Sequence, residues 1–104
     1  MLNSMLEQDF NKQLEKELEQ KCSKILKDKG ALSFKFVSPG NAGVPDRLIL
    51  TKAGKAFFIE YKQKGKDLRP LQRWQVARIE KQGFNVYVVD SLDKFEEVLA
   101  IECI

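Results

Sequence analysis

The sequence contains four short runs typical of β-strands, and the third and fourth are separated by a helix-forming segment. The runs cover residues 32–37, 46–51, 56–62 and 84–90. The segment between the last two begins at Pro70 and stops before Gly83, which are favoured positions for the start and end of a helix. A strand–helix–strand unit folds as a right-handed parallel crossover. We therefore expect a sheet in which residues 56–62 and 84–90 run parallel.

The ends of the chain have the pattern of amphipathic helices. Apolar residues recur at helical spacing from Leu6 to about Asp28, and Gly30 is a natural stop. Ser91 can cap a final helix. Residues 46–51 and 56–62 lie close enough in sequence to form a hairpin. The order α-β-β-β-α-β-α predicts an α/β fold with a mixed central sheet flanked by helices, and 104 residues predict one domain over residues 1–104.

Composition narrows the chemistry that such a domain can perform. The chain has no histidine and only two cysteines, Cys22 and Cys103. Triads that depend on histidine are therefore excluded, and two cysteines alone do not make a zinc site. Any catalysis has to use carboxylates, lysines and a hard metal ion. No apolar run is long enough for a membrane helix and no secretory signal is recognisable, so we expect a cytoplasmic protein.

Positive charge is concentrated in the middle of the chain. Residues 35–82 hold eleven basic and four acidic side chains, whereas residues 83–104 hold one basic and five acidic side chains. A basic centre suits a surface that faces a polyanion. A solvated lysine-rich face explains the charge equally well.

Three residues in the expected hairpin carry the strongest chemical signal. Side chains alternate along a strand, so Glu60 and Lys62 project from the same face. A turn centred near residue 53 places Asp46 opposite Glu60, where cross-strand Cβ atoms are about 4.5–5.5 Å apart. Two neighbouring carboxylates repel each other unless a cation separates them, and Mg²⁺ or Mn²⁺ suits such oxygen ligands. An ordinary cross-strand ion pair is the alternative interpretation of the same trio.

The segments "PGNAGVPDRLIL", "FFIEYK", "RPLQRWQ" and "GFNVYVVDS", in this order, closely resemble the VRR-NUC family of PD-(D/E)XK nucleases. The resemblance extends from about Leu18 to Leu99. It implies a restriction-endonuclease-like fold and a metal-dependent DNA endonuclease activity that uses Mg²⁺ or Mn²⁺. Members with little beyond the nuclease domain resemble phage or prophage proteins and, in fold and size, Holliday-junction resolvases.

The resemblance also implies roles for individual residues. Asp46 and Glu60 match the acidic metal ligands, the Tyr61 carbonyl adds a third oxygen, Lys62 matches the catalytic lysine, and Gln72 lines the site. Where the family usually has Glu-Leu-Lys, this chain has tyrosine in the middle position, which points away from the active face.

The family further places a glutamate of the first helix near the metal, and Glu19 is the best match, with Glu15 one turn earlier as the alternative. Both residues also fit an ordinary solvated helix with interleaved lysines. Four basic residues near the strands are candidates for DNA contacts, or for solvated positions: Lys35, Lys64, Lys66 and Arg69. Trp74 has the helical spacing of a core residue, and Phe34 is expected to pack on the sheet.

We therefore expect a metal-dependent endonuclease that acts on branched or duplex DNA. A small domain presents a small footprint on a branched duplex, so a symmetric homodimer with two sites is expected. Two alternatives remain open: a catalytically silent nucleic-acid-binding module of the same fold, and a flap-specific or nicking nuclease. A sequence-reading restriction enzyme is disfavoured because no target-recognition insertion is visible.

Overall fold

The computed structural model describes residues 2–104, with side chains from residue 6 onward. The predicted order of elements is confirmed. In chain order the elements are α1 (Leu2–Asp28), β1 (Leu32–Lys35), β2 (Arg47–Leu50), β3 (Ala56–Tyr61), α2 (Pro70–Lys81), β4 (Val86–Val89) and α3 (Leu92–Glu102). The strands are shorter than the sequence predicts, because runs of strand-like residues continue past the last paired position.

The four strands form one mixed sheet in the order β1-β2-β3-β4. Strands β1, β2 and β3 pair antiparallel, and β3 pairs parallel with β4 through the helix α2, as the sequence predicts. Arg47 lies opposite Ile59 in the hairpin. This is the register predicted from the sequence, and its continuation by one residue brings Asp46 opposite Glu60.

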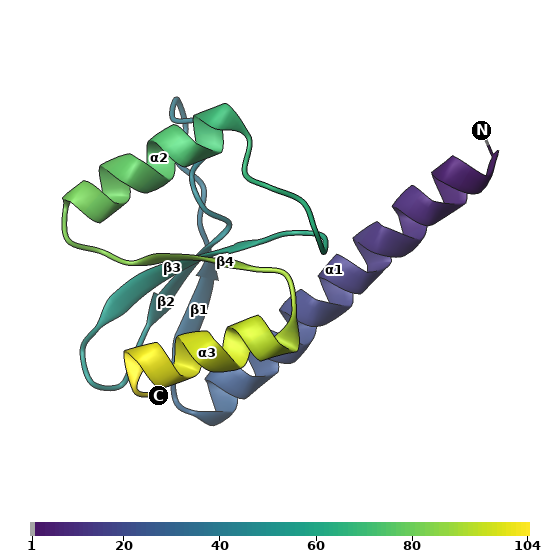
Figure 1. Ribbon diagram of the computed structural model, residues 1–104. Coiled ribbons are helices and arrows are strands. Elements are labelled where there is room, and N and C mark those ends of the chain that lie inside the picture. The colour runs from purple at the N-terminus through teal and green to yellow at the C-terminus, as the bar shows by residue number, and fades with distance from the viewer. Residues whose placement is uncertain (1) are drawn as a thin grey trace.

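The hydrophobic core lies on one face of the sheet. Figure 1 shows α3 and the C-terminal half of α1 on this face and α2 on the other. Alternation along β3 turns Phe57, Ile59 and Tyr61 toward the core. They pack with buried residues of the neighbouring strands and of the two helices: Ile49, Val89, Cys22, Leu26, Phe95, Val98 and Leu99.

The opposite face is covered less completely, and two expectations about it are wrong. Trp74 is 55% exposed rather than part of the core, because α2 turns Gln72 and Gln75 toward the protein instead. The Arg78 guanidinium lies 4.6 Å from the centre of the Trp74 ring. Phe34 is 50% exposed, because β1 is the edge strand and α2 lies over β4 at the other side of the sheet.

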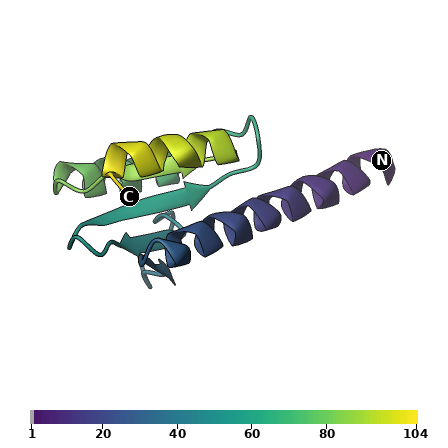
Figure 2. The same cartoon turned by 90° about the horizontal axis from the view of Figure 1, so that it is seen from below.

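Helix α1 continues well beyond the sheet. Its N-terminal half projects away from the rest of the chain, with Leu6, Phe10 and Leu14 exposed (Figures 1 and 2). Among the side chains described, those of α1 that join the core or an ion pair to the sheet begin at Leu18. Among residues 2–104 no helix combines the length and the hydropathy needed to span a bilayer.

A buried glutamate ties the end of α3 to the start of β4. Glu102 Oε2 accepts hydrogen bonds from the Tyr87 hydroxyl at 2.5 Å and from Asn85 Nδ2 at 2.8 Å. Burial and the bond to Glu102 raise the pKa of Tyr87 to about 12. Tyr87 is the sheet partner of Ile59, but its ring packs against Phe57 on the core face, whereas Glu60 alternates to the other face and meets Gln72 of α2.

Replacing Tyr87 with phenylalanine is expected to lower the free energy of unfolding by about 1–3 kcal/mol, because it removes a hydrogen bond to a buried carboxylate. Urea unfolding followed by circular dichroism measures the loss. Cleavage activity at saturating substrate should be unchanged, since Tyr87 and Glu60 lie on opposite faces of the sheet. Wild-type stability in Tyr87→Phe would show that the short contact contributes nothing.

Candidate active site

Asp46 and Glu60 are held side by side by hydrogen bonds from the backbone N–H groups of Asp46 and Tyr61. The Asp46 N–H donates to Glu60 Oε1 at 3.1 Å, and the Tyr61 N–H donates to Asp46 Oδ2 at 3.2 Å. The hairpin register produces this exchange, since it brings residue 46 opposite residue 60. Pro45, which is fully buried, fixes the chain immediately before Asp46. The two carboxylates are therefore fixed by main-chain contacts, although repulsion opposes their proximity.

The raised pKa values of the two carboxyl groups reflect burial first and, for Glu60, this repulsion. Burial, and after it the charge of Asp46, raises the pKa of Glu60 to about 7. Burial also raises the pKa of Asp46. Burial and the charge of Asp46 raise the pKa of Glu15 as well. Close carboxylates with raised pKa values are typical of sites that hold a cation or move a proton.

The pair lies in a polar cavity of about 560 Å³, and Lys62 also lines it. Lys62 follows β3 directly, and its N–H donates to the Val89 carbonyl at 3.0 Å, which continues the parallel pairing by one residue. Its positive charge offsets part of the rise in the pKa values of both carboxylates. The predicted trio of Asp46, Glu60 and Lys62 thus shares one cavity.

Helix α2 contributes Gln72 to the same cavity. Gln72 Nε2 donates to Glu60 Oε2 at 3.1 Å, and Gln72 Oε1 accepts from the Arg69 N–H at 2.8 Å. The second bond caps the first turn of α2, and Pro70 begins the helix at the position where its missing N–H has no cost. One buried side chain therefore both starts the helix and orients Glu60.

The structure places the two glutamates of α1 differently. Glu15 lines the cavity of Asp46 and Glu60, whereas Glu19 forms an ion pair with Arg47. The Glu19 Oε1 atom lies 2.7 Å from Arg47 Nη2 and accepts from Nε at 2.8 Å. Glu19, the first choice from the sequence, is thus engaged outside the cavity, and the alternative Glu15 is the residue brought into it. Arg47 carried no signal in the sequence that distinguished it from other strand residues.

The basic residues also separate into two groups. Lys66 and Arg69 line the cavity, together with Lys12, which the sequence analysis did not single out. Lys12 lies three residues before Glu15 on α1, and this spacing was the available signal. Lys64 is exposed in the adjacent turn, and Lys35 is exposed on the edge strand, outside the cavity.

The donor set fits a hard divalent cation. Among residues 2–104 no three acidic, histidine or cysteine side chains converge closely enough to hold an ion by themselves. Mg²⁺, however, typically uses one or two carboxylates and keeps waters for substrate phosphate. Asp46 and Glu60 supply two such carboxylates, and their mutual repulsion would be relieved by a cation.

The chain matches the sequence model of the VRR-NUC domain over residues 3–93, which include every residue of the cavity. The chain belongs to the VRR-NUC family. This membership confirms the resemblance seen in the sequence and assigns the protein to a family of nucleases.

Two relatives agree with the membership. "Putative nuclease p44" of Acyrthosiphon pisum secondary endosymbiont phage 1 is 42% identical over 80 residues, or 77% of this chain and 82% of the phage protein. A solved structure described as a VRR_NUC domain superposes with a TM-score of 0.79 and 26% identity, covering 84% of this chain and 95% of the other. The fold of this VRR-NUC protein is therefore the fold predicted from its sequence.

Proposed function

We propose that this protein is a Mg²⁺- or Mn²⁺-dependent DNA endonuclease. The observation that carries the proposal is the pair of carboxylates, half-buried Asp46 and buried Glu60, held together by backbone hydrogen bonds beside Lys62. A module that only binds nucleic acid gains nothing from two repelling carboxylates on its binding surface. Membership of a nuclease family supports a catalytic role for these carboxylates.

In this proposal Asp46, Glu60 and the Tyr61 carbonyl hold the cation, and Glu15 faces it from α1. A divalent cation in such a site polarises the scissile phosphate and lowers the pKa of a bound water. Lys62 orients the attacking water and offsets the negative charge that develops on the phosphate. Gln72 keeps Glu60 in its rotamer. Lys12, Lys66 and Arg69 contact the DNA backbone at the cavity rim.

We further propose that the substrate is branched DNA and that the active form is a homodimer. A domain of 104 residues covers little of a branched duplex, and two symmetric sites would cut two strands of a junction. Sedimentation of the protein as a monomer at concentrations that support full cleavage would contradict the dimer.

The direct test uses labelled four-way junctions, flaps, linear duplex and single strands, each with Mg²⁺, Mn²⁺ or EDTA. We expect symmetric cuts at the junction that require a metal. Asymmetric cuts at flaps, or nicks in duplex DNA, would support nuclease activity but show that a four-way junction is not the preferred substrate. Binding of every substrate without cleavage in either metal would overturn the proposal in favour of a binding module.

Replacing Gln72 with methionine, which has similar length but cannot hydrogen-bond Glu60, is expected to lower metal affinity or activity by about 10–100-fold. The loss should appear as a higher Mn²⁺ concentration for half-maximal cleavage. Gln75→Met is the matched control, because Gln75 is also buried on α2 but donates to the Ala42 carbonyl at 3.0 Å. If both variants need the same Mn²⁺ concentration for half-maximal cleavage, Gln72 plays no part in metal binding.

A further inference from the structure

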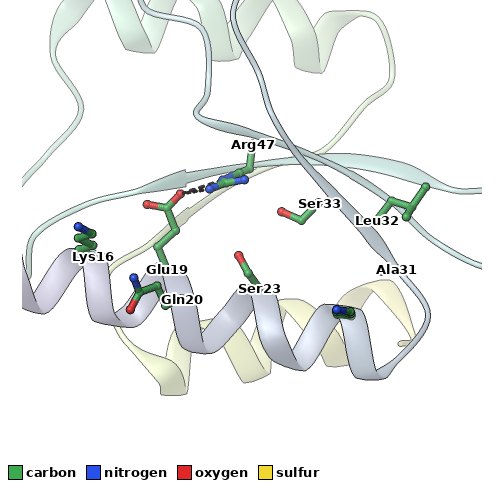
Figure 3. A pocket seen from close by; sticks show the side chains of 9 residues that line it. Lys16, Glu19, Gln20, Ser23, Ala31, Leu32, Ser33 and Arg47 are labelled. Atoms are coloured by element: carbon green, nitrogen blue, oxygen red, sulfur yellow. Dashed lines mark hydrogen bonds and ion pairs between the residues drawn. The ribbon is translucent and has the colours of Figure 1, made fainter.

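A second cavity lies outside the candidate active site. It is a groove of about 610 Å³ between α1 and the strands β1 and β2. Figure 3 shows the side chains that line it, with Glu19 and Ser23 rising from the helix and Ser33 and Arg47 facing them from the strands. None of the assigned functions of Asp46, Glu60 and Lys62 uses this groove.

The charged side chains that line the groove are mostly basic, and they stand beside apolar surface from Ala31 and Leu32. They are Lys16, Lys27 and Arg47 against one acid, Glu19, whose charge the Arg47 guanidinium neutralises. The arginine has five N–H donors, and the two bonds to Glu19 leave others free to face the groove. Arg47 and Glu19 are about a quarter exposed, so both can be reached from solvent.

The groove lies next to the candidate active site along α1. Lys12 and Glu15 line the cavity of Asp46, and Lys16 and Glu19, the next residues on the same side of the helix, line the groove. Arg47 follows Asp46 in the chain. Lys16 and Lys27 are separated by about 16 Å along the helix axis, which spans several nucleotides of a strand.

We propose that this groove is a second phosphate-binding site, which holds the nucleic-acid backbone on one side of the scissile bond. The inference rests on the proposed nuclease function and adds the path of the strand: from the cavity of Asp46, past Arg47, and along α1 toward Lys27. Arg47 and the two lysines bind successive phosphates.

The test measures binding of a labelled DNA duplex as a function of salt, with every protein carrying Asp46→Asn to prevent cleavage. The groove variant is Lys16→Ala with Lys27→Ala. The control is Lys21→Ala with Lys29→Ala, which removes the same charge from exposed positions outside the groove. We expect the groove variant to bind about tenfold more weakly and to lower the salt slope by about 1–2, since each lost phosphate contact removes about 0.9. The control should change neither quantity by as much.

One further measurement separates this inference from the proposed function. In the wild-type background the groove substitutions should raise KM and leave kcat nearly unchanged, whereas loss of kcat is expected of the active site. If the groove and control variants bind DNA equally well, the groove is not a phosphate-binding site, and the proposed nuclease function is unaffected. If the wild-type protein cleaves no DNA but the groove variant still binds more weakly than the control variant, the proposed nuclease function would be overturned and the groove would stand.

Discussion

Replacing Lys62 with alanine is expected to lower the rate of DNA cleavage by about 10²–10³-fold, because the substitution removes the positive charge beside the reacting phosphate. Binding of DNA should change little, since Lys12, Lys66 and Arg69 still line the cavity. Single-turnover cleavage at saturating enzyme separates the two effects. Lys52→Ala is the matched control, because Lys52 is exposed in the turn at the opposite end of β3.

A rate for Lys62→Ala within about threefold of that of the control would show that the lysine takes no part in the chemistry. In that case the cross-strand trio would be the ordinary ion pair that the sequence also allows. Lys62→Arg adds a sharper comparison, because a guanidinium keeps the charge but places its donors differently. We expect partial recovery of the rate in Lys62→Arg.

Replacing Asp46 with asparagine is expected to stabilise the metal-free protein while it abolishes cleavage. Asparagine keeps an oxygen that can accept from the Tyr61 N–H, but it removes the charge that opposes ionisation of Glu60. We expect a gain of about 1–2 kcal/mol in the free energy of unfolding near pH 8, measured in urea with EDTA present. A loss of stability at that pH would contradict the electrostatic account.

The same argument fixes the sign of the pH dependence. Glu60 has a pKa of about 7 in the folded protein against 4.5 for an ordinary glutamate, so the folded state holds the proton more tightly. The metal-free protein should therefore lose stability as the pH rises from about 4.5 to about 7, by up to about 3 kcal/mol. The loss should be smaller in Asp46→Asn. Identical pH profiles for the two proteins would show that the carboxylates do not interact.

The sequence predicts the part of the site that depends on strand geometry. Alternation and the hairpin turn are sufficient to bring Asp46 opposite Glu60, and the register observed between β2 and β3 is the predicted one. The role of Gln72 was implied by the family resemblance, and Pro70 predicts only where the helix that carries it begins. These features depend on local rules that residues close in sequence already satisfy.

The contribution of α1 depends on how the helix lies against the sheet, which the sequence does not specify. Glu15 and Glu19 lie one turn apart, and both project toward the same side of the helix. Only the position of Arg47 decides that Glu19 is drawn into an ion pair while Glu15 reaches the cavity. The prediction that Trp74 lies in the core was wrong for a similar reason. Helix α2 turns Gln72 and Gln75 inward, where they hydrogen-bond Glu60 and the Ala42 carbonyl.

Calorimetric titration of Mn²⁺ into the wild-type protein and into Asp46→Asn, near pH 7, tests the central claim most directly. We predict saturable binding to the wild type with release of protons, because Glu60 is partly protonated at that pH before the cation arrives. Binding to Asp46→Asn should be at least about tenfold weaker. Equal affinity in the two proteins, or cleavage that persists in EDTA, would contradict the assignment of Asp46 and Glu60 as the ligands of a catalytic cation.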